Sequence, residues 1–325
     1  MRFDVLETYL TGQFPRSEKL VEATRAAARG QISQSDLETA FRQDLAALGQ
    51  LQRETGLRYY VDGQLNWQDL FRPFSMIFNG ITYGGLIRWF DNNTFYRKPI
   101  IVGKVAFEHT YLEEYFRGNL LPDTAAKKAI LPGPFTFTVM SQNNTEKSFA
   151  DLVDDIAHAL KELVRDLTNA GYRFFQFDEP SLCTRSTTED ELRIAGQALD
   201  TCANGTEAKT AVQTYFGDGG TIAGRLLDYP VDCIGLDFYS TSLESLREYS
   251  FGKEIGCGCI DGRNSLLESP EDSLRFLKKV REHLEPKSLS LCPNCDLAFL
   301  PHSIAEKKVR LLSEIAEKWG NDGRA

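Results

Sequence analysis

The chain has 325 residues, of which 42% are hydrophobic and 26% charged, a composition typical of a globular protein with a full core. Its formal net charge of −9 excludes nucleic acid or an anionic membrane as a main partner, because no basic excess is available to neutralise phosphates. We expect neither a signal peptide nor a membrane span. The odd number of cysteines favours reduced thiols, and we therefore expect a cytoplasmic protein.

Short β-rich apolar segments recur along the chain, and several are followed by a helical stretch. In chain order we expect strands near residues 4–10, 58–63, 99–105, 129–139, 173–180, 210–216, 233–239, 254–262 and 288–295. Spacings of three and four between apolar residues predict helices over 33–56, 148–171 and 269–284. This alternation indicates an α/β fold with buried parallel strands, and roughly eight such units favour a single (β/α)8 TIM barrel domain over 1–325.

Nine strand candidates are one more than a barrel needs, so we expect an irregular excursion near residues 75–120. A doubly wound sheet is the alternative architecture. No G-x-G-x-x-G turn follows any of the strands, which argues against that alternative, and no nucleotide cofactor is expected.

The chemistry of a TIM barrel lies at the C-terminal ends of its strands. The polar residues and cysteines expected there are Asp62, Asp178, Glu179, Gln213, Thr214, Tyr215, Asp237, Asp261, Arg263, Asn264, Cys292 and Cys295. Asp237 ends an otherwise apolar strand, where a charge is costly unless it has a partner. Asp178 and Glu179 are adjacent and should face opposite ways, and we favour Glu179 as the one that faces the pocket. Asp237, Glu179 and Asp178 are the candidate catalytic residues.

The other polar residues at the strand ends are candidates for substrate binding: Asp62, Gln213, Thr214, Tyr215, Asp261, Arg263 and Asn264. Arg16, Lys19 and Lys104 are candidates for holding an anionic substrate. Structural roles stay open for several of them, since "DGRN" (261–264) could form an Asx turn and the "DEP" carboxylates could cap a helix at the rim. The aromatic and basic stretches 63–74 and 87–98 could stack a ring or pack the flank of a barrel.

Eight stretches, in order, resemble the cobalamin-independent methionine synthase family: "FPRSEKLVEATRAAARGQIS", "WFDNNTFY", "LPGPFTFTVMS", "FQFDEPSL", "QTYFGD", "PVDCIGLDFY", "CIDGRNS" and "NCDLAFLP". Members of that family resemble two tandem barrels, and this chain is similar to the N-terminal one over nearly its whole length. The resemblance implies a methyltransferase of methionine biosynthesis, which moves a methyl group from a methyl-folate or methyl-corrinoid to a thiol such as homocysteine.

In this family a zinc ion, which belongs to the C-terminal barrel, binds the substrate thiol as a thiolate. The four family ligand positions fall on Val212, Thr214, Asp237 and Cys295. Valine has no lone pair and a neutral threonine hydroxyl is a poor zinc ligand, so only Asp237 and Cys295 remain as metal ligands. We therefore expect the family zinc site to be incomplete.

The "CPNC" pair, Cys292 and Cys295, could be a redox couple, could contribute Cys295 to a metal site, or could pack and contact substrate. Cys257 and Cys259 of "GCGC" alternate along one strand, so only one of them could join Cys295 and Asp237 in a different cluster. Further along the chain, His302 could act as a rescue ligand or lie in an exposed loop.

Two other functions remain open. The chain could be a non-catalytic binding barrel that partners a separate catalytic barrel, or a metal-free decarboxylase or lyase that uses Asp62, Glu179 and Asp237 with its basic residues. In each case we expect a small-molecule ligand, folate-like or a thiol.

Overall fold

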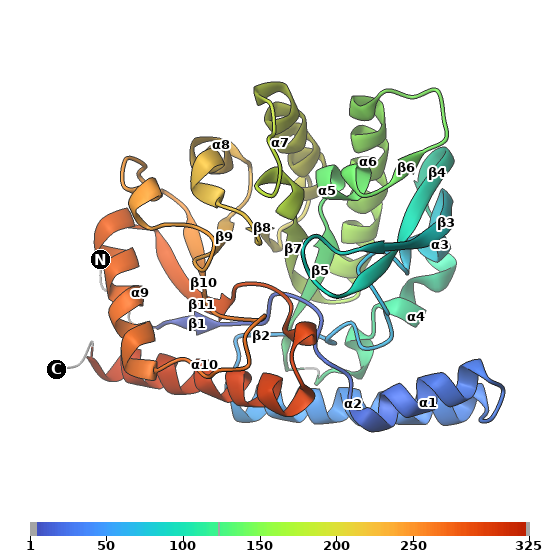
Figure 1. The fold of residues 1–325 in the computed structure, drawn as a ribbon, viewed down its shortest axis with the longest axis horizontal. Helices are drawn as coiled ribbons and strands as arrows, with labels where there is room; N and C mark the ends of the chain where they lie inside the picture. Colours follow the sequence, from blue (N-terminus) through green and yellow to red (C-terminus); the bar gives the residue numbers. More distant parts are fainter. Residues whose placement is uncertain (1–4, 123, 323–325) are drawn as a thin grey trace.

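The computed structural model describes residues 5–122 and 124–322, and it confirms the predicted barrel (Figure 1). Eight parallel strands follow one another in the order β1-β11-β10-β9-β8-β7-β5-β2. The amide of Arg58 donates to the carbonyl of Thr8 at 2.9 Å and so links the two ends of this nearly closed sheet. The strands are β1 (Glu7–Thr8), β2 (Tyr59–Tyr60), β5 (Ala126–Pro132), β7 (Tyr172–Asp178), β8 (Lys209–Thr214), β9 (Cys233–Asp237), β10 (Glu254–Ile260) and β11 (Ser288–Pro293).

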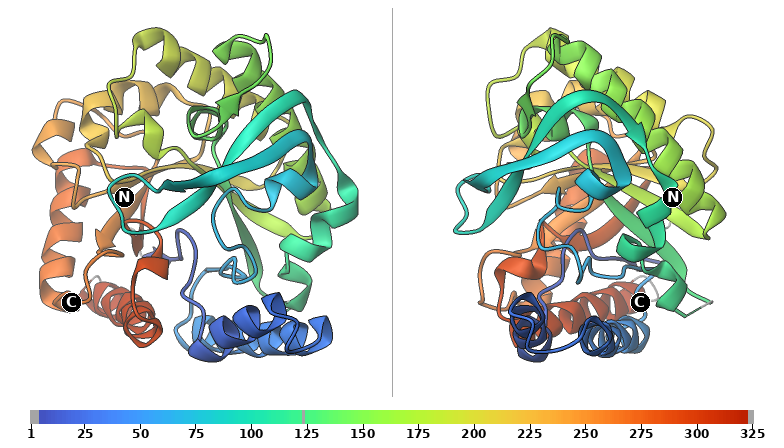
Figure 2. Two further views of the ribbon diagram at one scale, coloured as in Figure 1. Left: turned by 45° about the vertical axis from the view of Figure 1, so that its right-hand side comes forward. Right: turned by 90° about the vertical axis from the view of Figure 1, so that its right-hand side faces the viewer.

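The expected excursion is a separate small sheet. β3 (Phe78–Arg88) and β4 (Phe95–Phe107) form a long antiparallel hairpin, and β6 (Gln142–Asn143) pairs with β4. The strand expected at 99–105 lies in β4 and is therefore outside the barrel. Figure 2 shows the hairpin reaching across one end of the barrel.

Helices cover the outside of the barrel, as the alternating pattern predicted (Figure 1). The three expected helices correspond to α2, α6 and α9. The Ser33 and Ser148 side chains begin α2 and α6 with capping boxes. The helices are α1 (Glu18–Ala28), α2 (Gln34–Glu54), α3 (Phe74–Ile77), α4 (Leu112–Tyr115), α5 (Pro134–Val139), α6 (Phe149–Asn169), α7 (Glu189–Ala203), α8 (Ala223–Asp228), α9 (Pro270–Leu284) and α10 (His302–Asp322).

Two strand predictions need correction. The strand expected over 129–139 ends at Pro132, and the short helix α5 begins at Pro134. Proline is suited to the first turn of a helix because its fixed φ matches and its missing N–H is not needed there. The strand expected near 4–10 is limited to Glu7–Thr8 in the described part, and its expected start at residue 4 lies outside the described residues.

The barrel has two apolar regions. The larger one lies mainly between the strands and the covering helices. The smaller one fills the interior of the barrel with mixed aromatic and small side chains: Tyr9, Tyr59, Phe174, Ala211, Cys233 and Cys292. Among the described residues, no helix is both long and apolar enough to cross a membrane.

Candidate functional site

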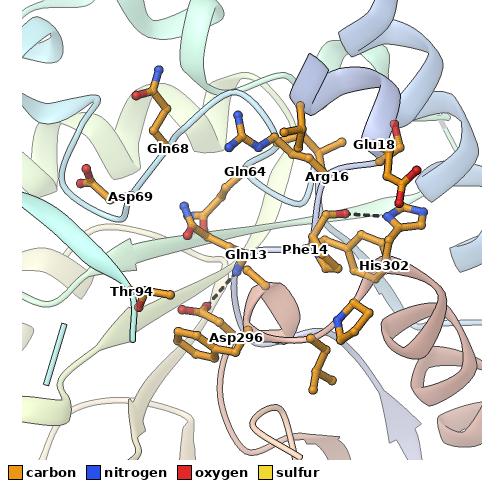
Figure 3. Close-up of a pocket in the computed structure, with 18 of the residues that line it drawn as sticks. Gln13, Phe14, Arg16, Glu18, Gln64, Gln68, Asp69, Thr94, Asp296 and His302 are labelled. Carbon is orange, nitrogen blue, oxygen red and sulfur yellow. Dashed lines mark hydrogen bonds between the residues drawn. The ribbon is translucent and has the colours of Figure 1, made fainter. Parts of the chain in front are cut away.

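A cavity of about 990 Å³ opens at the C-terminal mouth of the barrel (Figure 3). Its walls come from the segments that follow β1, β2 and β11, together with the tip of the β3–β4 hairpin. The aromatic side chains of Phe14, Trp89, Tyr96 and Phe299 contribute to the lining. The cavity thus lies where a TIM barrel carries its chemistry, and its volume suits a small organic molecule.

Charged residues of both signs line this cavity. Arg16, Lys19 and Arg25 contribute basic groups, and burial, followed by the charge of Arg25, lowers the pKa of Arg16. Glu18 and Glu22 of α1 line the same region. Two of the predicted basic residues, Arg16 and Lys19, are therefore brought to the mouth.

Asp296, a residue that the sequence analysis did not select, lies in the wall of the cavity. Its side chain is only 8% exposed, and one carboxylate oxygen, Oδ1, accepts the amide of Gln13 at 2.8 Å. Burial raises the pKa of Asp296 to about 7. A Cβ on Gly12 would lie 1.5 Å from this Oδ1, so the glycine permits the close approach.

Gln64 is a second buried polar residue in the cavity wall that the sequence analysis missed. It is 6% exposed and has a left-handed backbone, with φ of 51°. Its Nε2 donates to the carbonyl of Ile130 at 2.8 Å, while Oε1 has no hydrogen-bond partner among the described residues. Asp62 supports this turn, because its Oδ1 accepts the amide of Gln64 at 3.0 Å.

A chain of polar side chains leads from the barrel interior toward the mouth. Lys128 donates to Gln176 Oε1 at 2.6 Å, and Gln176 Nε2 donates to Asp178 Oδ1 at 2.7 Å. The Tyr215 hydroxyl lies 3.4 Å from Asp178 Oδ2. Burial and then the charge of Asp296 raise the pKa of Asp178 well above its usual value, whereas burial lowers the pKa of Lys128 to about 7. Asp178 thus faces the interior near Asp296.

Glu179 faces the other way, which reverses our expected orientation. Its two carboxylate oxygens accept the amides of Phe135 at 2.9 Å and Thr136 at 2.7 Å at the start of α5. Burial raises its pKa to about 7. The carboxylate therefore caps a helix instead of lining the mouth cavity.

Asp237 is held by four donors. Its oxygens accept the amides of Phe216 and Tyr239, the Ser240 hydroxyl and, at 3.0 Å, the Asn294 amide group. Gly235 on β9 pairs with Gln213 on β8, and a Cβ on Gly235 would lie 1.8 Å from the Gln213 side chain, so both positions face the barrel interior. Asp237 lies two residues further along β9 and therefore faces the interior as well.

The residues carried over from the family do not fit a zinc ion. Val212 and Thr214 flank Gln213 and therefore point to the opposite face of β8, where the Thr214 hydroxyl donates to the carbonyl of Gly235 at 3.3 Å. Cys295 is fully buried, and burial followed by nearby carboxylates, among them Asp237, raises the pKa of its thiol. The described residues contain no group of three or more His, Cys, Asp or Glu side chains placed to hold a metal ion.

The other cysteines and His302 also have structural surroundings. Cys292 belongs to the cluster inside the barrel, while Cys257 and Cys259 are buried in the larger core. All three are free thiols. The His302 ring lines the mouth cavity, and its Nδ1 lies 2.8 Å from the carbonyl oxygen of Pro15.

Three predicted residues lie in an exposed turn after β10. Asp261 Oδ1 accepts the amide of Arg263 at 2.9 Å, and Asn264 Oδ1 accepts the amide of Leu266 at 3.1 Å. Arg263 forms an ion pair with Asp91 in the tip of the hairpin, at 2.8 Å. The turn thus contacts the hairpin that covers the mouth.

Lys104, predicted to hold an anionic substrate, lies apart from the cavity. It is exposed on β4 and does not belong to the cavity lining. Asp62 is buried, and its two oxygens accept backbone amides, that of Gln64 at 3.0 Å and that of Arg117 at 2.9 Å.

The fold is that of a single-domain TIM barrel, with a cavity at its C-terminal mouth. The chain belongs to the cobalamin-independent synthase family, N-terminal domain, whose family model matches residues 84–285. It is 29% identical to a methionine synthase from Saccharolobus solfataricus and 30% identical to one from Saccharolobus islandicus; each match covers 95% of this chain and 93% of the relative. The barrel is also similar in fold to a B12-independent methionine synthase from Shewanella sp. W3-18-1, with a TM-score of 0.79, 23% identity and coverage of 98% of both chains.

Proposed function

We propose that this protein is a methyltransferase that moves a methyl group from a methyl-folate or methyl-corrinoid to a thiol such as homocysteine. The observation that carries the proposal is the mouth cavity of about 990 Å³, in a chain whose relatives over 95% of its length are named methionine synthases. Small-molecule sites span roughly 300–1,000 Å³, so the cavity favours a methyl-folate over the bulkier methyl-corrinoid as the donor.

The lining of the cavity supports a folate-like donor. Trp89, Tyr96 and Phe299 offer aromatic surface against which a planar ring can pack. Arg16 and Lys19 lie at the same cavity and are suited to the carboxylates of an anionic tail. A donor of this kind would place its ring toward the hairpin and its tail toward the segment after β1.

A second candidate function follows from the misfit of the zinc positions. Methyl transfer to a thiol needs the thiolate, which is the minor species near pH 7 for a thiol pKa of ~8.5. Since Val212 and Thr214 face away from the barrel interior, only Asp237 and Cys295 of the four family positions could ligate zinc, and two protein ligands are fewer than zinc normally takes. In this alternative the protein binds the donor, and a separate catalytic barrel activates the acceptor.

The test is to assay the purified chain for methionine formation from 5-methyltetrahydrofolate and homocysteine, alone and then mixed with a zinc-containing catalytic barrel of the family. Turnover by the chain alone supports the methyltransferase. Turnover that appears only on mixing, and exceeds that of the catalytic barrel alone, supports the partner function. Failure to bind the donor by calorimetry and to change turnover in either assay contradicts both.

Variants of basic residues sharpen this test. Arg16→Ala should weaken donor binding by about 10- to 100-fold, because a hydrogen bond to a partly buried guanidinium contributes roughly 1.5–3 kcal/mol. Lys104→Ala is the matched control, since it removes a basic group outside the cavity, and should leave the affinity unchanged. The decarboxylase or lyase function and the cytoplasmic location stay predictions.

A further inference from the structure

The helix α1 forms one wall of the mouth cavity but has almost no core of its own. Figure 1 shows it alongside α2 at the edge of the molecule. Of its eleven residues, all of them described, only Leu20 is buried, whereas α7 buries five of fifteen and α6 nine of twenty-one. Three alanines, Ala26–Ala28, favour a helix but offer little apolar surface. A helix with one anchoring side chain is held much less firmly than its neighbours.

Two cavities lie on either side of this helix. Lys19 and Val21 line the mouth cavity. Leu20 and Thr24 line a second cavity of about 290 Å³, whose other walls come from α2 and from the segments after β2 and β4. Protein interiors are normally close-packed, so a helix between two cavities lacks much of the packing that would hold it in place. The second cavity also gives α1 room to move.

The charged side chains of α1 do not fix its position either. Four of them are exposed and line the mouth cavity: Glu18, Lys19, Glu22 and Arg25. Within residues 5–122 and 124–322, none of these four side chains forms a hydrogen bond or an ion pair. Burial, followed by the charge of Arg25, lowers the pKa of Arg16, and an anionic ligand between the two guanidinium groups would offset this repulsion. The charges of α1 are therefore available to a ligand.

The two ends of α1 are tied to α2, so only the part between them can move. At the N-terminal end, the Ser17 amide and hydroxyl donate to the Asp44 carboxylate of α2 at 2.8 and 2.5 Å. At the C-terminal end, the short connection 29–33 leads directly into α2, whose first turn is capped by Ser33. An isolated helix shorter than about 12–15 residues is marginal in water, so α1 would lose its helical hydrogen bonds once Leu20 leaves its site.

We propose that α1 is a movable wall of the mouth cavity, which undocks from α2 to admit a ligand and docks again once the ligand pairs with its charged side chains. Undocking removes one side of the cavity and widens its entrance, while the well-packed barrel stays unchanged. Docking brings Lys19 and Arg25 against an anionic part of the ligand. This second step rests on the proposed function, because the anionic tail of a methyl-folate would supply the negative charge.

Hydrogen–deuterium exchange of the full chain, measured by mass spectrometry of its peptides, compares α1 with α6 in the absence of ligand. The amides of α1 should exchange about 100-fold faster or more than those of α6, because weakly packed elements open at a much smaller free-energy cost than the core. Saturating 5-methyltetrahydrofolate should slow the exchange of α1 by about 10-fold, as one hydrogen bond to a charged group predicts, and should leave that of α6 unchanged.

Two variants shift the docking of α1 in opposite directions. Leu20→Ala removes the one buried side chain of this helix and should speed the exchange of α1 by about 30-fold or more. Thr24→Leu adds apolar surface on the side of the second cavity and should slow that exchange by about 10-fold. Leu192→Ala is the matched control, because it removes a buried leucine from α7 and should leave the exchange of α1 unchanged.

Exchange of α1 that is as slow as that of α6 in the wild-type protein overturns the inference, as does exchange that neither folded variant changes. Thermal melting shows whether each variant is folded, and a Leu20→Ala variant that does not fold leaves the decision to Thr24→Leu. A donor that binds by calorimetry without slowing the exchange of α1 also overturns the inference and leaves the proposed function standing. If the donor does not bind, the proposed function fails, and the ligand-free comparison with the two variants decides the inference.

Discussion

The two ends of the barrel treat their buried polar groups in opposite ways. At the N-terminal end, Glu254 accepts the Lys209 ammonium and the Ser290 hydroxyl at 2.6 Å through Oε1, and the Ser288 hydroxyl at 3.1 Å through Oε2. These residues lie at or near the starts of β8, β10 and β11. Each carboxylate oxygen of Glu254 has a donor, as folding stability requires of a buried charge.

At the C-terminal end, some buried side-chain oxygens have no hydrogen-bond donor among the described residues. Gln64 Oε1 and Glu268 Oε2 are buried and have no hydrogen-bond donor in the part of the chain that the structure describes. The difference is informative, because a fold stabilised at one end can keep strained and unpaired groups at the other for a ligand.

The largest effect is expected from removing Glu254, the acceptor at the centre of the N-terminal hydrogen-bond network. Glu254→Ala should lower the free energy of unfolding by about 3 kcal/mol, since Lys209 loses its nearer carboxylate, at 2.6 Å, and keeps only Glu7, at 3.5 Å, in a site where the Lys209 and Glu254 side chains are only 15% and 12% exposed. Urea unfolding measures the loss. Burial alone would lower the pKa of Lys209, yet Glu254 raises it above its usual value, and this shift should disappear in the variant.

The double variant Lys209→Met with Glu254→Ala is the control for this prediction. Removing both charges should recover part of the lost stability, because no unpaired ion remains. A single Glu254→Ala variant that is as stable as the wild-type protein would show that the network does not support the fold.

How far the sequence predicts this arrangement depends on the scale. The strand–helix alternation predicts the barrel, and polar residues that follow apolar runs place Asp178 and Asp237 near the mouth. The same pattern does not predict which neighbour faces inward, because strands buried on both faces lack the alternation that marks one face. For this reason Glu179 was expected at the pocket where Asp178 faces the interior, and Thr214 was selected although its neighbour Gln213 is the residue that faces the interior.

The cavity wall was hardest to predict. The role of Gln64 depends on a left-handed backbone and on a bond to Ile130, 66 residues away, which leaves no local pattern. The position of Asp296 could have been predicted, since it directly follows the "CPNC" pair at the end of a strand. The two cysteines were instead interpreted as possible metal ligands, and the aspartate beside them was not selected. Trp89 was included in a stretch expected to stack a ring or pack, and the structure places it in the cavity wall.

Lys128 is buried inside the barrel, between the two ends, and should make the free energy of unfolding depend on pH. Burial lowers its pKa from 10.5 to about 7, so between these values the folded protein binds fewer protons than the unfolded chain. The contribution of Lys128 is therefore fully present above about pH 10.5 and is lost as the pH falls through about 7. The effect is about 1.4 kcal/mol for each unit of pKa difference.

Lys128→Met removes this titration, and we expect a smaller rise in the free energy of unfolding between about pH 7.5 and 9.5 than in the wild-type protein. Urea unfolding at the two pH values measures the difference. Lys127→Met, in the neighbouring residue, is the matched control and should keep the wild-type slope. An unchanged slope in Lys128→Met would show that this lysine remains charged in the folded state.

Glu179 tests whether the other carboxylate of the "DEP" pair belongs to the fold or to the ligand site. Glu179→Gln leaves one of the Phe135 and Thr136 amides facing a donor, so we expect a loss of about 1–3 kcal/mol in the free energy of unfolding with little change in ligand affinity. Glu191→Gln is the matched control, because it alters an exposed helix cap and should cost less. Weakened ligand binding without lost stability would instead assign Glu179 to the site.

The smallest effect is expected at the ion pair between Arg263 and Asp91, which links the turn after β10 to the hairpin over the mouth. The two side chains are 34% and 66% exposed, and exposed pairs typically contribute less than about 1 kcal/mol. Apolar packing holds the hairpin more firmly, because the almost fully buried Trp89 and Tyr96 rings lie 5.7 and 5.3 Å from the ring of Phe71, in the segment after β2. Arg263→Ala should therefore change the free energy of unfolding by less than about 1 kcal/mol and the ligand affinity by less than about threefold.

Arg193→Ala on α7 is the control, because it breaks a comparable exposed ion pair away from the mouth and should have an equally small effect. A much larger loss of affinity in Arg263→Ala alone would mean that charge, and not packing, keeps the hairpin over the cavity, and the mouth would then depend on polar pairs as the N-terminal end does.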